Sequence, residues 1–244
     1  MRPLALFLVI CSFAPSVQAG RRRFGGSYDT ETVPQRGVEL ETWVSEQTGA
    51  APLAALRWMT VFGLTDELEL ALPVEIVWRD LPDPMPNRTA FEAWGLEARW
   101  RLAPADPVEA GAFVPLMRLG VFRRVLERRT VEVEGNVVFS LALDAARLYA
   151  VLDLGGRLVV TEDDSALTGI VGTGLAVAAT EDLRFGLEVL FEHHTLVDAT
   201  TSWIAAGPNL SLTHGRLWLA ASLAIGLSSE APNFLPRVLW GIAF

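Results

Sequence analysis

The sequence of 244 residues contains one cysteine, Cys11, and no lysine, so arginine supplies every basic side chain. Cys11 lies in the leader described below, and we expect a mature chain without disulfides or thiolate metal sites. The formal net charge of −9 argues against nucleic-acid binding, which needs a basic surface. No uninterrupted apolar run of about 18 residues follows residue 20, although 51% of the residues are hydrophobic. A helical membrane protein is therefore not expected.

The N-terminal residues have the pattern of a secretory signal peptide. Arg2 supplies a positive charge, residues 4–14 (LALFLVICSFA) form a short apolar core, and Val17 and Ala19 are small. We expect cleavage after Ala19, with a signal peptide at 1–19. A buried first helix is the alternative. A lipoprotein is disfavoured because Ile10 precedes Cys11 where a small residue is expected.

An alternation of period two dominates the rest of the chain. Residues 67–78 (ELELALPVEIVW), 130–143 (TVEVEGNVVFSLAL) and 183–194 (LRFGLEVLFEHH) place large apolar side chains on one face and mostly polar ones on the other. Such alternation indicates strands with one apolar and one polar face. Strands of this length span the core of a bilayer when they are tilted.

Turn signals divide the chain into twelve expected strands, with short turns and longer polar loops alternating between them. The expected strands are 37–47, 53–62, 67–78, 91–102, 109–122, 129–142, 146–160, 166–179, 182–195, 201–212, 215–226 and 235–244. Short turns are expected at 64–67, 143–147, 180–183 and 212–215, and longer loops at 79–90, 196–201 and 227–234. The proline-containing connection 103–109 is the exception, because it falls on the side of the short turns.

An even strand number with short turns on one side predicts an all-β fold, a closed antiparallel transmembrane β-barrel over residues 37–244 in the outer membrane of a Gram-negative bacterium. Closure pairs the first strand with the last and leaves both ends in the periplasm. A secreted β-sandwich or lipocalin-like barrel is the alternative. The strand number, the terminal Phe244 and a set of tryptophans on the apolar face favour the membrane barrel: Trp58, Trp78, Trp94, Trp100 and Trp240.

The last strand resembles the signal by which outer-membrane proteins are recognised by the barrel-assembly machinery. The resemblance rests on Val238, Trp240, Ile242 and Phe244, and it implies that machinery and outer-membrane lipid as partners. Residues 33–44 (VPQRGVELETWV) and 61–76 (VFGLTDELELALPVEI) are also similar to a loosely defined family of small outer-membrane transporters, some linked to the uptake of aromatic compounds. This second resemblance implies transport and says little about the solute.

The polar face of the predicted strands carries charges of both signs, and this face is assigned to the lumen. Two interpretations compete, a filled lumen braced by arginine–carboxylate pairs and a narrow conduit for small solutes. We favour the conduit and expect weak cation selectivity. Residues 20–36 are expected as a flexible periplasmic tail, with insertion into the barrel mouth as the alternative. The expected lumen residues include Glu39, Glu41, Arg57, Glu67, Glu69, Glu75, Glu97, Arg99, Arg101, Glu132, Glu134, Arg157, Glu188 and Glu192.

The histidines are the remaining candidates for chemistry. His193 precedes Thr195 by two residues, which is similar to the spacing of histidine and serine in outer-membrane lipid hydrolases, but threonine replaces the serine. Glu192 and His194 share the lumen side with Glu188, and a metal site there needs a further ligand. We therefore predict no catalytic residue, no metal and no cofactor, and keep hydrolysis around His193 as the minor alternative.

Overall fold

The structure is a computed structural model that describes residues 22–49, 52–79, 88–104, 112–125, 129–143, 147–195 and 199–244. The predicted signal peptide and Gly20 lie outside these residues. No helix in the described part of the chain is long and apolar enough to cross a membrane. Its elements are the strands β1 (Val38–Gln47), β2 (Leu53–Gly63), β3 (Leu68–Arg79), β4 (Arg88–Arg101), β5 (Phe113–Arg124), β6 (Val131–Leu143), β7 (Leu148–Val160), β8 (Ser165–Ala178), β9 (Leu183–Thr195), β10 (Thr200–His214), β11 (Leu217–Gly226) and β12 (Phe234–Ala243).

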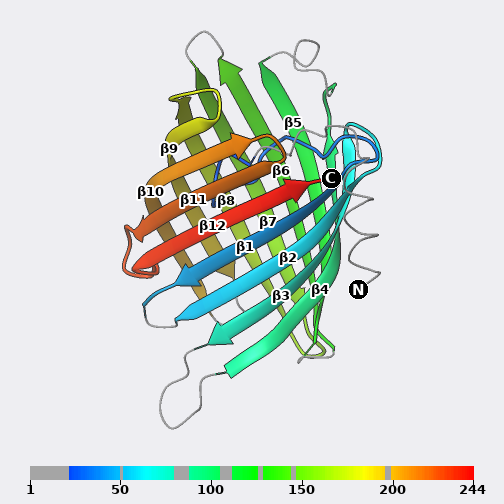
Figure 1. The fold of residues 1–244 in the computed structure, drawn as a ribbon. Helices are drawn as coiled ribbons and strands as arrows, with labels where there is room; N and C mark the ends of the chain where they lie inside the picture. The colour runs from blue at the N-terminus through cyan, green and yellow to red at the C-terminus, as the bar shows by residue number, and fades with distance from the viewer. Residues whose placement is uncertain are drawn as a thin grey trace, which may run out of the picture.

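The strands form one closed antiparallel barrel, in which each strand pairs with its neighbour in sequence and β1 pairs with β12 (Figure 1). The closing pair places Leu40 opposite Ile242 and Val44 opposite Val238. Closure gives every strand two partners, so no edge exposes unpaired backbone groups. The predicted all-β fold, strand number and pairing of the first strand with the last are confirmed.

Large apolar side chains cover the outside of the barrel. Leu72 is 50% exposed, Trp100 is 55% exposed and Leu187 is 63% exposed, and the five tryptophans predicted on the apolar face all lie on this surface. An apolar surface over a whole barrel is the expected surface of a strand array that faces lipid. The alternative of a sandwich with a buried leucine face is excluded, because these side chains point out of a closed ring.

The connections alternate between the two ends of the barrel. Short turns join β2 to β3, β8 to β9 and β10 to β11 at the end where the chain terminates. The predicted turn 143–147 between β6 and β7 falls at the same end, but residues 144–146 lie outside the described part. The connection from β4 to β5 also lies at this end and is longer, as the sequence predicted, although residues 105–111 lie outside the described part. Parts of the predicted loops 79–90 and 196–201 likewise lie outside it.

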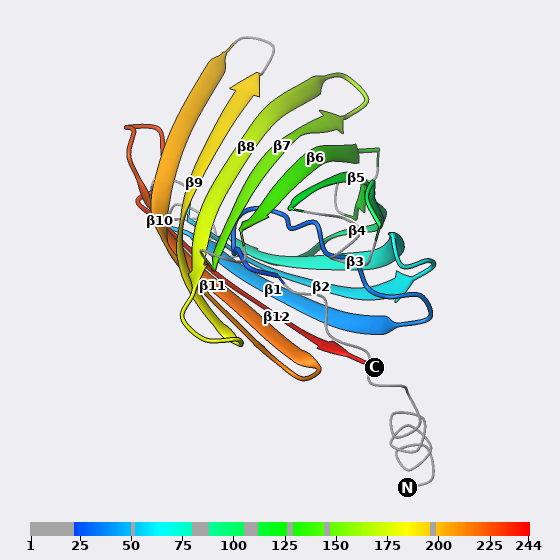
Figure 2. The same ribbon diagram turned by 90° about the horizontal axis from the view of Figure 1, so that it is seen from above.

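Residues 22–37 cross the inside of the barrel before β1 begins. In the view from above they run as the dark blue segment within the ring of strands (Figure 2). Phe24 and Asp29 are each 1% exposed, so this part of the segment is enclosed, whereas Gln35 and Arg36 at its end are exposed. The expectation of a flexible periplasmic tail is corrected here, because the segment finds hydrogen-bond partners and a close apolar fit on the lumen wall. We call residues 22–36 the inner segment.

Candidate functional site: the lumen and its inner segment

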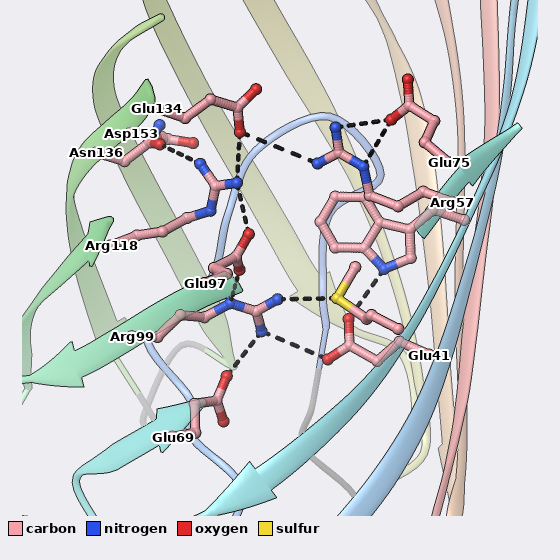
Figure 3. A network of polar contacts seen from close by, with 12 residues as sticks. Glu41, Arg57, Glu69, Glu75, Glu97, Arg99, Arg118, Glu134, Asn136 and Asp153 are labelled. Carbon is pink, nitrogen blue, oxygen red and sulfur yellow. Dashed lines mark hydrogen bonds and ion pairs between the residues drawn. The ribbon is translucent and has the colours of Figure 1, made fainter. Parts of the chain in front are cut away.

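One half of the lumen wall carries a continuous network of ion pairs, drawn in Figure 3. Inward-facing positions of neighbouring strands come into register, so charges that are distant in sequence lie side by side. Arg99 on β4 reaches Glu69 at 2.8 Å, Glu97 at 2.5 Å and, at 3.4 Å, Glu41 on β1. It also donates to the sulfur of Met59 at 3.5 Å. One guanidinium therefore balances three glutamates.

Arg118 on β5 extends the network. Its Nη2 lies 2.6 Å from Glu97 and 2.5 Å from Glu134, and its Nη1 donates to Asn136 at 2.9 Å. Asn136 in turn donates to Asp153 at 2.7 Å. Side chains with several partners of this kind satisfy the hydrogen-bonding needs of buried charges, which are costly when they are left unpaired.

A second cluster lies toward the opposite end of the barrel, away from the chain terminus. The pairing of β3 with β4 shifts register between Glu75 and Ile76, and this bulge turns Glu92 into the lumen. Glu92 accepts from Arg79 at 2.8 Å and from Arg124 at 2.6 Å, and Arg124 continues to Glu132 at 2.8 Å. Strict alternation places Glu92 on the outer face, so the sequence pattern does not predict it in the lumen. A bulge inserts one extra residue into a strand, so the alternation of inward and outward side chains is interrupted there.

The opposite half of the wall carries several glycines, and the inner segment lies against them. A Cβ atom added to Gly174 on β8 would meet the ring of Phe24 at 2.4 Å, and one added to Gly172 would meet Ser27 Oγ at 2.5 Å. These glycines let the backbone of the segment approach the wall closely. Phe24 also stacks on Tyr149, with ring centroids 6.0 Å apart.

Glu188 on β9 anchors the middle of the segment. Its carboxylate accepts from three consecutive backbone N–H groups, those of Gly25 at 3.2 Å, Gly26 at 2.9 Å and Ser27 at 3.1 Å. Backbone N–H groups that converge in this way form a concave anion site. Asn209 donates to the carbonyl of Arg23 at 2.7 Å and adds a further contact from β10.

The next part of the segment contacts the charged half. Tyr28 lies beneath the guanidinium of Arg118, 4.2 Å from ring centroid to carbon, and its N–H donates to Asp153 at 3.0 Å. Burial raises the pKa of the Tyr28 phenol, so this ring is neutral under Arg118. Further along, the N–H of Val33 donates to Glu69 at 2.6 Å.

Two arginines of the segment are buried in the lumen. Arg23 pairs with Asp29 and Glu31 within the segment, and its guanidinium lies 3.9 Å from the centre of the Tyr149 ring. Arg22 instead contacts the barrel wall, at 3.0 Å from Glu41 and 3.7 Å from Glu69. Burial would lower the pKa of Arg22, but the neighbouring carboxylates outweigh burial and raise it overall. Arg22 therefore stays charged.

The remaining predicted lumen residues occupy different positions. Glu39 is buried and accepts from the indole N–H of Trp218 at 2.8 Å. Arg57 pairs with Glu75 at 2.8 Å. Glu67 lies in the turn before β3, where Thr65 donates to it at 3.2 Å, so it does not face the lumen as expected. Three further members are also half-buried: Arg101 at the end of β4, Arg157 opposite Glu134 in the pairing of β6 with β7, and Glu192 on β9.

The last strand faces outward at alternate positions. Val238, Trp240 and Ile242 are 38%, 40% and 37% exposed on the outer surface. Phe244 follows the end of β12, and its N–H donates to the carbonyl of Val38 at 2.8 Å. The terminal aromatic is thus fixed to the first strand.

The histidines are placed on two faces of β9. His193 lies on the exposed outer side, and its Nδ1 is 2.7 Å from Oγ of Ser202, its direct partner on β10. The sequence spacing pairs His193 with Thr195 instead, because cross-strand neighbours are not visible in the spacing. His194 faces the lumen, 3.2 Å from Glu192 and 3.1 Å from Thr168. The described residues hold no group of three metal ligands.

Comparison with known proteins identifies the fold. No family matches the sequence, and no curated protein matches it. An outer-membrane channel from Pseudomonas putida F1 has a TM-score of 0.64 at 10% identity, over 88% of this chain and 98% of that one. The translocator domain of the autotransporter NalP from Neisseria meningitidis has a TM-score of 0.55 at 11% identity, over 88% of this chain and 90% of that one. The KdgM porin, in complex with disordered oligogalacturonate, has a TM-score of 0.53 at 12% identity, over 84% of this chain and 99% of that one. The chain has the fold of these outer-membrane β-barrels.

Proposed function

We propose that the chain is a narrow outer-membrane channel for small polar solutes, closed at rest by its own inner segment. This proposal rests on one observation, namely that a separate segment of the chain fills the lumen. The lumen is occupied by residues 22–36, which are held by hydrogen bonds and ion pairs. A filling of this kind can be withdrawn, whereas side chains of the wall cannot. The likeness to porins and channels supports the same reading.

A structural barrel with a permanently filled lumen is the competing interpretation, and a reversible lock separates the two. The Cβ atom of Ser27 lies 3.3 Å from the Cβ position at Gly172, close to the separation of about 3.5–4.5 Å in disulfides. The variant carrying Ser27→Cys and Gly172→Cys can therefore fix the segment when it is oxidised. Cys11 is the only native cysteine, so the pair is unambiguous.

The test is conductance of the refolded protein in planar bilayers. We expect small, intermittent conductance from the native chain, none from the oxidised double-cysteine variant, and recovery after reduction. Deletion of residues 20–33 should give steady conductance with weak cation selectivity, measured as the reversal potential across a KCl gradient. Silence of all these forms at every voltage would leave the filled barrel as the better explanation.

The outer-membrane location, the lipid contact and the assembly route belong to the same proposal. The apolar outer surface supports contact with lipid, and the exposed alternation of the last strand supports recognition by the barrel-assembly machinery. Truncation of Phe244 should then reduce the amount of folded barrel recovered from outer membranes. An unchanged amount would restrict the terminal aromatic to its contact with β1.

Hydrolysis of a lipid ester is the second candidate, favoured by one contact. Ser202 and His193 form a hydrogen-bonded pair at 2.7 Å on the outer surface, where a lipid would lie. In the described part of the chain no carboxylate or amide side chain is shown orienting His193, which a triad requires. Release of fatty acid from phospholipid micelles that disappears with Ser202→Ala would establish this activity.

A further inference from the structure

The inner segment brings a guanidinium to a particular point of the wall. Arg22 Nη2 lies 3.0 Å from Glu41 and 3.7 Å from Glu69, and the Arg22 side chain is 5% exposed. Both glutamates are almost completely buried. The second terminal nitrogen of Arg22, Nη1, is buried without a hydrogen-bond partner among the described residues. Arg22 therefore enters this site as a charge, without the full set of contacts that a guanidinium can make.

The wall itself has an excess of acid at this point. In the network of Figure 3 the strands supply six carboxylates and three arginines. The carboxylates are those of Glu41, Glu69, Glu75, Glu97, Glu134 and Asp153, and the arginines are Arg57, Arg99 and Arg118. Glu39 lies close by on β1 and adds to the negative potential at Arg22. The carboxylates of the strands outnumber their guanidinium groups, so a cation from outside the wall is stabilised beside Glu41 and Glu69.

Contacts other than those with Arg22 also hold the two glutamates in position. Trp43 donates its indole N–H to one oxygen of Glu41 at 2.9 Å, and this leaves the other oxygen toward Arg22. On the wall, Glu69 is fixed by Arg99 at 2.8 Å, and while the inner segment is in place the N–H of Val33 in that segment also donates to it at 2.6 Å. Two carboxylates that are already positioned form a receptor for a planar cation with N–H donors.

We propose that Glu41 and Glu69 form a binding site for solutes that carry a guanidinium group, and that Arg22 is a tethered ligand occupying this site in the closed channel. This inference deepens the proposed function, since it assigns a solute class and a means of closure to the same lumen. A tethered group has an effective concentration on the order of millimolar, so a free guanidinium must compete at comparable concentration. Solute binding and withdrawal of the inner segment are thereby coupled.

The test is chemical rescue of Arg22→Ala, with Arg36→Ala as the matched control. Arg36 belongs to the same segment but is exposed, whereas Glu41 and Glu69 are buried. Each variant is refolded with and without millimolar methylguanidinium, and with tetramethylammonium, which has the same charge but no N–H donor. The readout is the midpoint temperature of unfolding, which is independent of conductance.

We expect Arg22→Ala to unfold at a lower temperature than the native chain and methylguanidinium to restore most of the difference. Tetramethylammonium should not restore it, and Arg36→Ala should respond to neither compound. Adding Glu41→Gln to Arg22→Ala should weaken the apparent affinity for methylguanidinium about tenfold, as expected for loss of a charged hydrogen-bond acceptor. If Arg22→Ala does not refold alone, refolding yield becomes the readout, with Arg22→Lys as the charge-retaining variant.

Equal rescue by both cations, or no rescue of a destabilised Arg22→Ala, would overturn the site. An Arg22→Ala variant as stable as the native chain would do the same. Conductance separates this inference from the proposed function. Rescue without conductance in any form would uphold the site and reject the channel, whereas conductance without rescue would uphold the channel and reject the site.

Discussion

The two halves of the lumen wall differ in their side chains and in what they pack against. The half formed by β1–β6 is crowded with charges that neutralise one another, as in the cluster of Arg99 with Glu69 and Glu97. The half formed by β8–β10 presents glycines, such as Gly172 and Gly174, against which the inner segment packs. The first half keeps its own shape through ion pairs, and the second leaves room for a separate piece of chain. We therefore expect substitutions that remove charged side chains to destabilise the first half, and substitutions that enlarge the glycines to destabilise the packing of the second.

The strongest test of this contrast removes the central cation of the charged half. Arg99→Met leaves three buried carboxylates without their shared guanidinium, and unpairing a buried charge costs about 3–5 kcal/mol. Urea unfolding followed by tryptophan fluorescence measures the loss. Adding Glu69→Gln and Glu97→Gln should recover part of it, because neutral amides need no counter-charge. A loss below about 1 kcal/mol for Arg99→Met would mean that other arginines take over.

Enlarging the glycines of the second half is the reverse experiment. In Gly174→Val the new side chain would overlap the ring of Phe24, and overpacking of this kind costs about 1–3 kcal/mol. We expect the inner segment to leave the wall, so that trypsin cleaves after Arg22 and Arg23 and bilayer conductance rises.

Two controls fix the interpretation of Gly174→Val. Phe24→Ala in the same chain removes the overlapping ring and should return stability toward the native value. Gly169→Val lies on the same strand, but its Cβ position has no neighbour closer than 4.0 Å, so it should be tolerated. Resistance of Gly174→Val to trypsin would contradict the close fit between segment and wall.

The contrast also explains which parts of the molecule the sequence could predict. Period-two alternation reports a property of each strand alone, so the twelve strands, the apolar outer face and the outward tryptophans follow from it. The inner segment has no period, and its glycines and arginines resemble a flexible tail. Its position depends on Gly174 and Glu188, which lie more than a hundred residues away.

Two details of the site show the same limit. Glu92 enters the lumen because a bulge interrupts the alternation, and no residue in its neighbourhood signals the bulge. Ser202 lies beside His193 only through the pairing of β9 with β10. The sequence indicates which residues of one strand share a face. Contacts between strands depend instead on the register of their pairing, and turns and bulges set that register.

The anchor of the inner segment should have a smaller effect than either wall. Glu188→Gln keeps the side-chain shape but replaces a carboxylate that accepts from Gly25, Gly26 and Ser27 with a neutral amide. We expect a loss of about 1–2 kcal/mol, because hydrogen bonds to a charged acceptor are the stronger ones. Hydrogen exchange at residues 25–27 should accelerate. Glu192→Gln, on the same strand but away from these amides, is the control.

The smallest effect should come from an ion pair outside the lumen. Arg129 pairs with Glu162 across two outer connections, and the two side chains are 73% and 48% exposed. Water and salt screen such a pair, so Arg129→Ala should change the free energy of unfolding by no more than about 0.5 kcal/mol. The same urea assay used for Arg99→Met applies, at low and high salt. A loss approaching that of Arg99→Met would show that the number of ion pairs, and not their burial, determines the stability of this barrel.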